Sequence, residues 1–523
     1  MTEKATAKIC MYRLAELGDC FMLTFSAGAS KSRMLVDCGS FRNGDPSVDR
    51  LGAVTAAIAD DLQGAPIDVV VATHQHNDHV SGFVHCEQAF RDMGVGQVWL
   101  SWLDDPKDKT AQKIGEQFNN LLRRLYNLAA AARPAAMPAA GGRAAAAAAT
   151  RSTRARLAGA RPAAGRAARS AGADAPRPAG ANVPPPAGAP RSLTGPSLAV
   201  LHDILGFYGA SDVTPPGLPA NAVKILKTLG TKDPEYLRPG RTLDMPGLPA
   251  GSVRVHVLGP PFKEADLYRK DPKKGESYDP ALAAANSLAF RLFQTAREEG
   301  GEEQSAETEA YPFNARYKRG RGDPREPTPL TALVARYGEP SAAWRTIDED
   351  WMQQAEGLAL FLDTYTNNSS VVLAIELVAS GKVLLFAADA QVGNWASWAK
   401  VRWDDPSVST DDLLARTVFY KVGHHASHNA TLVPAFEKVG GSDLVALIPV
   451  HKKDPNIKKK NGWKMPAKNL FKRLKEKTEG RVLQMDGVNP PECDAAVNPA
   501  KAAWKKVGIT PRSTDMAIEL EIS

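Results

Sequence analysis

The chain contains 523 residues, more than one hydrophobic core usually supports, so we expect several domains or one domain with large insertions. Its 43% hydrophobic content is ordinary, no stretch approaches the ~20 apolar residues of a membrane-spanning helix, and the start lacks a secretory signal, so we predict a cytoplasmic protein without a membrane partner. The net charge of +7 is compatible with an acidic partner such as nucleic acid but does not locate its binding surface.

The first hundred residues are rich in short apolar runs separated by turn signals. Residues 8–15, 20–27 and 33–39 predict a meander of three strands, because β-branched and aromatic residues are frequent in them. Residues 50–63 predict a helix. The continuous β-branched run at 67–74 is typical of a strand buried on both faces of a sheet.

A strand predicted at 97–105 and a helix predicted at 109–128 precede an abrupt change in composition. Residues 129–190 are almost entirely Ala, Pro, Gly and Arg, with nine prolines, nine arginines and one acidic residue. The Pro and Gly residues interrupt any helix, and few large apolar side chains are present to offset the entropy of ordering. We predict a disordered insertion, whose arginines either contact phosphates or belong to a solvated linker.

Ordered sequence resumes near residue 197 and includes a strand-like run at 253–262. We predict a second insertion at 265–355, partly a charged loop, because this region contains a polar stretch without apolar periodicity. The last third is again rich in strands, which we predict at 369–378, 381–390, 416–428 and 443–451. We see no fixed-period repeat and predict one domain over residues 1–523, interrupted by the two insertions.

The loop THQHNDHVSG at residues 73–82 brings three histidines and an aspartate together at the end of an apolar run. In an extended loop alternate side chains project to the same side, so His74 and His76 can share one metal ion. Asp78 and His79 are adjacent and diverge, which allows them to serve a second ion about 3.5–4 Å away. Nitrogen and carboxylate ligands suit Zn²⁺, with Mn²⁺ or Fe²⁺ as alternatives, and the five scattered cysteines indicate no thiolate site.

This HxHxDH pattern resembles the signature of the metallo-β-lactamase superfamily. Asp37 in LVDCG resembles the family's early strand-end aspartate, Asp389 in LLFAADA resembles its metal-bridging carboxylate, and YKVGHHASH resembles its late histidine motif. The motif-bearing regions cover roughly residues 8–128 and 251–450. The resemblance implies an α/β fold, a four-layer αβ/βα sandwich with low-complexity insertions, and a hydrolase that uses two divalent metal ions.

Within the superfamily, the chain is most similar to the β-lactamase-like domain of the DNA-uptake competence protein and to phosphorylcholine esterases. The residues that carry this likeness are GDCF at 18–21, NNSSVVL at 367–373 and KVGHHAS at 421–427. Ala426 replaces the usual Gly of the HHGS motif.

The third histidine motif of the family is missing, since no GHTPG-like sequence lies between the histidine loop and Asp389. His202 and His256 are the remaining candidates for that ligand position. Otherwise the first metal ion completes its coordination with water or with an asparagine such as Asn367.

The chemistry implied is metal-assisted hydrolysis, in which two divalent ions lower the pKa of a shared water from ~15.7 towards ~7 and polarise the scissile bond. Asp78 would hold a metal ion and orient the nucleophile. We assign His425 as a ligand and His424 as a catalytic donor, although the sequence leaves the reverse order open, and His428 is a second catalytic candidate. Asp37 either supports a ligating histidine by a hydrogen bond or caps a turn. The predicted metal ligands are His74, His76, Asp78, His79, Asp389 and His425.

Residues 452–477 form a basic segment with eleven Lys or Arg residues against two acidic ones. Because Trp463 and Phe471 are interspersed, the segment suits a phosphate backbone with occasional base stacking, and a solvated helix face is the alternative. The candidate residues for contacting nucleic acid are Lys458, Lys459, Lys460 and Lys464.

Three functions remain open from the sequence. The first is a phosphodiesterase or nuclease, which the narrower resemblance and the basic segment favour. The second is a hydrolase of small esters, lactones or thioesters, which would require a narrow apolar pocket. The third is a non-catalytic interaction protein that retains a metal site, and the complete HxHxDH motif together with Asp389 weighs against it.

Overall fold

The computed structural model of the chain describes residues 4–131, 201, 203–210, 217–269, 272–273, 276–277, 348–451, 454–458, 463–485 and 498–523. All elements below belong to one compact unit, apart from the last two residues of helix α4. The insertion predicted at 129–190 lies outside the described residues from residue 132 onward, as does most of the one predicted at 265–355.

The first sheet has eight strands, in the order β14-β15-β1-β2-β3-β4-β5-β6. Their bounds are β1 Ala5–Tyr12, β2 Cys20–Ala27, β3 Ser30–Cys38, β4 Ile67–Val71, β5 Val95–Ser101, β6 Glu235–Leu237, β14 Arg512–Ser513 and β15 Ala517–Ile522. Strands β1, β2, β3 and β15 pair antiparallel, whereas β3, β4, β5 and β6 run parallel. The parallel half therefore directs the carboxyl ends of β3 and β4 to the same edge.

The second sheet has seven strands, in the order β13-β12-β11-β10-β9-β8-β7. Their bounds are β7 Thr242–Asp244, β8 Val253–Gly259, β9 Val372–Leu377, β10 Lys382–Phe386, β11 Thr417–Lys421, β12 Val445–Ile448 and β13 Val482–Gln484. Strands β10 to β13 are parallel, and β7, β8 and β9 complete the sheet as an antiparallel group.

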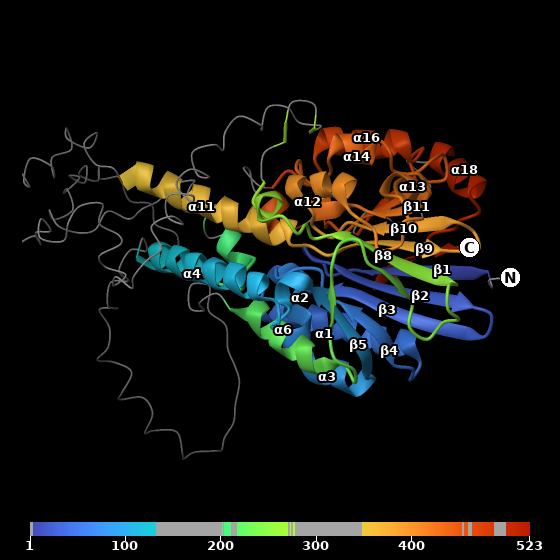
Figure 1. Cartoon of the computed structure of the whole chain (residues 1–523), viewed down its shortest axis with the longest axis horizontal. Coiled ribbons are helices and arrows are strands. Elements are labelled where there is room, and N and C mark those ends of the chain that lie inside the picture. Colours follow the sequence, from blue (N-terminus) through green and yellow to red (C-terminus); the bar gives the residue numbers. More distant parts are fainter. Residues whose placement is uncertain are drawn as a thin grey trace, which may run out of the picture. The chain divides into compact units, whose positions relative to one another are not determined.

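Helices cover the outer faces of both sheets (Figure 1). Beside the first sheet lie α1 Asp45–Leu62, α2 Asn77–His85, α3 Glu87–Met93 and α6 Leu218–Leu229. Beside the second lie α12 Val392–Ser397, α13 Thr410–Ala415, α14 Val433–Phe436, α16 Lys468–Lys477 and α18 Asn498–Lys506. The remaining helices of the described residues are α4 Lys109–Ala131, α7 Glu264–Leu267, α11 Asp348–Asn368 and α15 Pro455–Lys458, with single 3₁₀ turns at Trp102–Asp104, Trp398–Lys400 and Gly423–Ala426.

The two sheets enclose one hydrophobic core, and the alternation of side chains along β10 shows how it is built. Leu384 and Phe386 point into the layer between the sheets, where Phe386 meets Phe21 edge to face at 5.7 Å. Val383 and Leu385 point to the opposite face and pack beneath the outer helices. Neither face of such a strand contacts water, which explains why its sequence is continuously apolar rather than alternating. The predicted four-layer αβ/βα sandwich is confirmed.

The predicted strands and helices occur near the predicted positions, with differences at their ends. Helix α1 begins at Asp45, five residues before the predicted start, because Pro46 is well suited to the first turn of a helix. Strand β15 and the short strands β6, β7, β13 and β14 were not predicted. Among the described residues, no helix is both long and apolar enough to cross a membrane.

Helices α4 and α11, which adjoin the two predicted insertions, run side by side (Figure 1). The rings of Phe118 on α4 and Tyr365 on α11 lie 4.9 Å apart. Tyr365 also stacks against Tyr268 at 5.1 Å, and both belong to a separate apolar cluster that includes Trp102. This packing holds the last turns of α11 next to the histidine loop.

Candidate metal centre

The candidate site lies at one edge of the sandwich, where loops leave the carboxyl ends of four strands. Asp37 lies in β3 near its end, and the loop after β4 carries the histidine motif into the first turn of α2. Asp389 follows β10, and the His424-His425 doublet follows β11. Parallel neighbours deliver their carboxyl ends to a common edge, so residues far apart in sequence meet here.

The backbone of these loops adopts left-handed conformations at several non-glycine residues. Asp37 has φ +57°, Ala388 has +48°, and His424, His425 and Ala426 have +42°, +50° and +60°. Such residues cost of order 1–3 kcal/mol each and cluster at functional sites, because the surrounding structure must hold them in place. Here they turn the side chains of the two strand ends toward each other.

Four side chains form a compact group of the kind that binds a metal ion: Asp78, His79, Asp389 and His425. The Nε2 atoms of His79 and His425 each lie 3.3 Å from Oδ2 of Asp389. Oδ2 of Asp78 lies 3.0 Å from Nε2 of His425 and 3.8 Å from Nε2 of His79. Ligand atoms at the corners of a tetrahedron with bonds of ~2.1 Å are about 3.4 Å apart, which these separations approach.

His74 and His76 form a second, adjoining pair. Nε2 of His74 lies 3.2 Å from Nδ1 of His76, again close to the tetrahedral spacing. The His74 and His79 rings are 4.1 Å apart between centroids, so the pair borders directly on the four-residue group. The structure thus brings together all six side chains that the sequence suggested as ligands, in two neighbouring subsets.

Hydrogen bonds at the Nδ1 atoms fix the orientation of three of these imidazole rings. Nδ1 of His79 lies 2.8 Å from Oδ2 of Asp37, and Nδ1 of His425 lies 2.8 Å from the carbonyl oxygen of Pro449. Nδ1 of His74 lies 3.1 Å from the Thr73 hydroxyl, which donates its proton to Asp37. Each ring therefore directs its Nε2 atom into the site, the arrangement that metal-ligating histidines require.

Lys421 is a site residue that sequence reasoning missed. Its buried ammonium group contacts the Asp19 carboxylate, the carbonyl oxygen of Ala388 at 3.0 Å and Oδ1 of Asp389 at 3.2 Å. The backbone N–H of His424 also donates to Oδ1 of Asp389, at 3.1 Å. Both contacts occupy Oδ1 and leave Oδ2 facing the histidines. A lysine inside the otherwise apolar strand TVFYK was the available signal, because buried lysines need a partner.

The charge distribution of the site favours cations. Burial raises the pKa of Asp78, but His79 and His425 outweigh this effect and hold it below its usual range. Burial alone would lower the pKa of His425, yet the carboxylates of Asp389 and Asp78 raise it to about 10. The pKa of His79 is likewise raised well above its usual value against burial, mainly by Asp389 and Asp19. In the metal-free chain these two histidines therefore carry protons that a metal ion would displace.

Two other imidazoles of the site behave differently. Burial lowers the pKa of His76 to about 3, so its ring is neutral and can act as a ligand at neutral pH. Burial also lowers the pKa of His424 to about 4.

The donor set fits divalent metal ions. Nε2 of His79 and Oδ1 of Asp78 are fully buried, yet neither has a hydrogen-bond partner among the described residues. Burying polar atoms without hydrogen bonds costs free energy, so their convergence indicates a binding site for a cation rather than a packed core. Imidazole nitrogens and carboxylate oxygens, without thiolates, are typical of zinc, manganese and iron sites.

The other predicted site residues take separate positions. Nδ1 of His424 faces Ser427 at 2.8 Å and Gln391 at 3.2 Å, so His425 rather than His424 joins the four-residue group. His428 is exposed and is not part of that group. His256 lies between β7 and β9, where its Nε2 contacts Glu376 at 3.0 Å.

Of the residues considered for the missing ligand position, those that the structure describes do not supply an imidazole there. His256 is engaged by Glu376 and by the hydroxyl of Thr242 at 3.0 Å. His202 lies outside the described residues. The side-chain amide of Asn367 donates to Asp363 at 3.2 Å, while its Oδ1 atom is buried without a hydrogen bond within the described part of the chain.

The basic segment reaches the metal centre through an aromatic contact. Trp463 stacks on Phe207 at 5.4 Å, and the Phe207 ring lies 5.1 Å from the ring of His76. The Phe41 ring contacts the rings of Phe207 and Trp463 edge to face. Lys464 follows directly and is exposed, whereas the side chain of Lys458 and all of residues 459–462 lie outside the described residues.

Comparison with known proteins bears on part of this site. A family model, the metallo-beta-lactamase superfamily, matches residues 17–95. This stretch includes Asp19, Asp37 and the histidine loop at 73–82, whereas Asp389 and His425 lie beyond it. Most proteins of that superfamily are hydrolases, and they typically bind divalent metals. No match was found among curated proteins, and the narrower likeness to competence proteins and phosphorylcholine esterases stays a prediction.

Proposed function

We propose that the chain is a metal-dependent hydrolase that binds two divalent zinc ions between the histidine loop and the loops after β10 and β11. The observation that carries this proposal is the group of Asp78, His79, Asp389 and His425, whose ligand atoms all lie within 4.8 Å of one another. The adjoining pair of His74 and His76 would hold the other ion.

Bound ions of this kind supply an activated water and polarise the bond to be cleaved. The chain's own residues prepare the site for that role. Lys421 and the N–H of His424 hold one oxygen of Asp389, so that its other oxygen faces His79 and His425. Asp78 is buried, and its pKa is lowered, so its carboxylate remains ionised. Its Oδ1 atom has no hydrogen-bond partner among the described residues. His424 is a neutral imidazole next to the site. It can accept a proton during the reaction and then donate it to the leaving group.

We propose a phosphodiester, and specifically a nucleic-acid strand, as the substrate. Trp463 and Lys464 adjoin Phe207 and hence His76, so an aromatic surface and an exposed cation lie next to the metal centre. Base stacking on aromatic side chains together with backbone contacts by lysines is the usual way of holding single strands.

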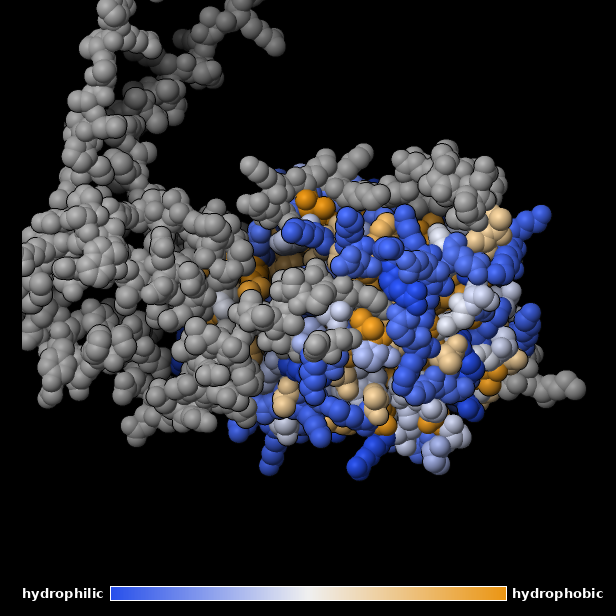
Figure 2. All heavy atoms as spheres, turned by 90° about the horizontal axis from the view of Figure 1, so that it is seen from above, coloured by the Kyte–Doolittle hydropathy of each residue, from blue (hydrophilic) through white to orange (hydrophobic). Residues whose placement is uncertain are grey.

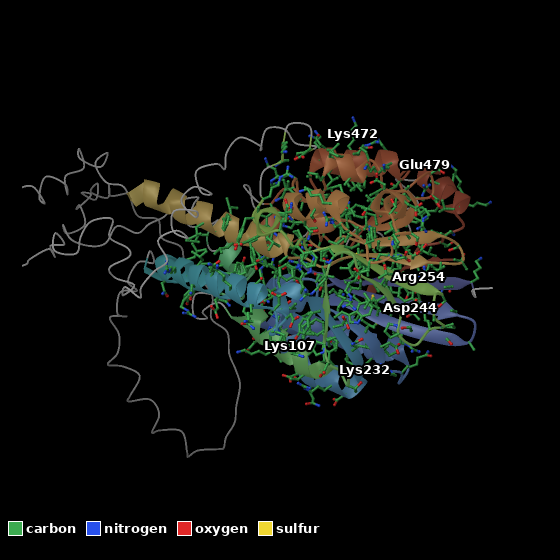
Figure 3. The ribbon with its side chains drawn as sticks, viewed as in Figure 1. Lys107, Lys232, Asp244, Arg254, Lys472 and Glu479 are labelled. Atoms are coloured by element: carbon green, nitrogen blue, oxygen red, sulfur yellow. The ribbon has the colours of Figure 1, made fainter. Side chains whose placement is uncertain are left out.

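The helical part of the basic segment contributes less to this proposal. On α16, Leu470 and Leu474 are buried against the second sheet, and Lys472 projects outward from the molecule (Figure 3). Arg473 forms ion pairs with Glu437 and Glu476. Figure 2, which views the molecule from the α16 side, shows a largely hydrophilic face there. This is the solvated helix face that the sequence allowed as an alternative, so we assign nucleic-acid contact to the 458–464 stretch instead.

The test compares two triple variants of equal charge change. In the first, Lys458, Lys459 and Lys460 are replaced by Ala. In the control, the exposed residues Lys31, Lys107 and Lys232 are replaced by Ala, and the latter two lie on the opposite side of the unit from α16 (Figure 3). Binding and hydrolysis of single-stranded DNA, and hydrolysis of a lactone and of a thioester, are measured between low and high salt.

The first variant should bind DNA more weakly and reduce the slope of log K against log salt by about 2, since about 0.7 counterions per contact are released from single strands. The control and the lactone reaction should not change. An unaltered slope would contradict the nucleic-acid substrate. Hydrolysis of lactones or thioesters alone would favour the small-ester hydrolase, and metal binding without any hydrolysis would favour a non-catalytic interaction protein.

A further inference from the structure

His76 differs from the other histidines of the metal centre in what lies behind it. The outer nitrogens of His74, His79 and His425 each have a hydrogen-bond partner at 2.8–3.1 Å. The outer nitrogen of His76, Nε2, is buried without a hydrogen bond among the described residues. It faces Oδ1 of Asp363 at 3.8 Å.

The orientation of the His76 ring follows from its contact with His74. Nδ1 of His76 lies 3.2 Å from Nε2 of His74, whose own Nδ1 is engaged by Thr73. These two nitrogens are therefore the pair that can share an ion, and Nε2 of His76 is directed away from it. A ligating histidine normally donates this remaining N–H to a carboxylate or a carbonyl group, which fixes its tautomer and makes it a better ligand.

Asp363 is held in place to provide such a carboxylate. Its Oδ2 atom accepts a hydrogen bond from the amide of Asn367, one turn further along α11, at 3.2 Å, and its Oδ1 atom lies on the side of His76. The helix itself is anchored near this point, because the Thr366 hydroxyl lies 2.9 Å from the Tyr208 hydroxyl. The Asn368 amide donates to the carbonyl oxygens of Leu267 and Arg269, both at 3.0 Å.

We propose that Asp363 is a positioning residue of the metal centre, whose carboxylate accepts the Nε2 proton of His76 and so keeps Nδ1 available for an ion. The residue acts through His76 and does not itself bind the ion. The separation of 3.8 Å needs to shorten by about 1 Å to become a charge-assisted hydrogen bond. This inference rests on the metal-binding function proposed above.

The assignment gives α11 a role that the family resemblance does not contain. The helix begins within the insertion predicted at 265–355, and its last two turns carry both Asp363 and Asn367. The ion held by His74 and His76, for which the described residues offer no third histidine, would thus be bound more tightly by a more basic His76, through a carboxylate on a helix that begins inside the second insertion and extends beyond it.

The experiment measures binding of Zn²⁺ and Mn²⁺ to the whole chain by mass spectrometry and by competition with a chromophoric chelator. Asp363→Ala removes the acceptor, and Asp363→Asn keeps a neutral oxygen at the same place. Asp266→Asn is the matched control, since the Asp266 side chain is as exposed as that of Asp363, at 14%, and lies on α7 next to the end of α11.

Asp363→Ala should lower the affinity of one of two bound ions 10–100-fold and leave the other unchanged. Asp363→Asn should recover much of that loss, and the control should bind both ions as the unmodified chain does. Wild-type affinity for both ions in Asp363→Ala would overturn the inference. Equal defects in the Ala and Asn variants would show a direct ligand and also overturn it.

Two further measurements separate this inference from the proposed function. If the unmodified chain binds no ion, the proposed function fails, and the role of Asp363 fails with it. Thermal unfolding in chelator identifies a folding defect, and in that case the Asn variant, which keeps the size and shape of the side chain, decides the outcome.

Discussion

The ammonium group of Lys421 lies 3.2 Å from Oδ1 of Asp389, and both side chains are buried between the carboxyl ends of β10 and β11. The same ammonium contacts the buried carboxylate of Asp19. Burial lowers the pKa of Lys421, but Asp19 and Asp389 outweigh this effect and raise it above its usual value, so the lysine stays charged. One fixed cation therefore organises two carboxylates on opposite sheets.

Replacing Lys421 by Met should destabilise the metal-free protein by about 3–5 kcal/mol, because it leaves buried carboxylates without their partner. Added Zn²⁺ should recover part of that loss by neutralising the same carboxylates. Chemical unfolding in chelator and in zinc measures both effects. Lys400→Met, which breaks an exposed pair with Asp266, is the control and should change stability by less than about 1 kcal/mol. Equal stability of Lys421→Met and wild type would contradict the role given to this pair.

Replacing Asp78 by Ala should remove most hydrolysis while leaving the fold largely intact. The contacts of this carboxylate within the described residues are with His425 and His79, so its loss affects the centre rather than the core. A decrease in kcat/KM equivalent to several kcal/mol of transition-state stabilisation is expected. Steady-state kinetics with circular dichroism as the folding check measure it. Undiminished activity of this variant would exclude the proposed metal mechanism.

The ion pairs of Glu376 should make stability depend on pH at a site remote from the metal centre. A hydrogen bond from His256, with help from Arg416, lowers the pKa of Glu376 to about 2 against the effect of burial. The group's contribution is then fully present above its ordinary pKa of 4.5 and is lost as pH falls toward 2. Glu376→Gln should be less stable than wild type at pH 7, and urea unfolding should show that difference shrinking between pH 4.5 and 2. A difference that does not vary over this interval would refute the prediction.

Replacing Ala426 by Gly should change the stability of the protein less than replacing an equally buried strand alanine by Gly. Its φ of +60° is left-handed, which costs a residue with a Cβ atom about 1–2 kcal/mol, whereas the extra unfolded-state entropy of Gly offsets about 0.5–1 kcal/mol. Loss of the buried Ala426 methyl group costs about 0.8 kcal/mol, so the free energy of unfolding should change by less than about 1 kcal/mol. Ala446→Gly in strand β12 is the contrast and should destabilise more, since Ala446 is equally buried but has no left-handed backbone conformation to relieve. A loss of stability in Ala426→Gly as large as that in Ala446→Gly would argue against the backbone conformation described here.

Deleting residues 135–188 should leave thermal stability almost unchanged. The deleted sequence contains few large apolar side chains, and shortening the connection roughly fourfold changes the entropy of loop closure by only about 1 kcal/mol, in favour of the folded state. Differential scanning calorimetry of the shortened chain measures the effect. A large drop in melting temperature would show that this insertion contributes to the core.

The sheets and the histidine loop could be predicted because their signals are local. The β-branched run of β4 and the apolar run of β10 each indicate a buried strand within a few residues. His74 and His76 share a side of the loop through simple alternation. The short strands β6, β7 and β13 could not be predicted, because three residues give no measurable periodicity and depend on neighbours already in place.

The residues that support the metal ligands could not be predicted from the sequence, for a different reason. Asp363 lies 287 positions after His76, on a helix that begins inside a charged stretch, and no local pattern distinguishes its carboxylate from other surface acids. Lys421 was recognisable as unusual, but its partners depend on how the two sheets pack. Which imidazole of the doublet enters the site is decided by the left-handed turn at His424 and His425, which sequence spacing does not reveal.

Strand β15 pairs antiparallel with β1, so that Ala7 lies opposite Ile522. During synthesis on the ribosome, β1 emerges early, but its outer edge stays unpaired until almost the whole chain has followed. At 5–20 residues per second this interval is roughly 25–100 s. An apolar strand with an open edge invites pairing with other nascent chains. The N-terminal half of this protein is therefore expected to depend on chaperones until translation is nearly complete.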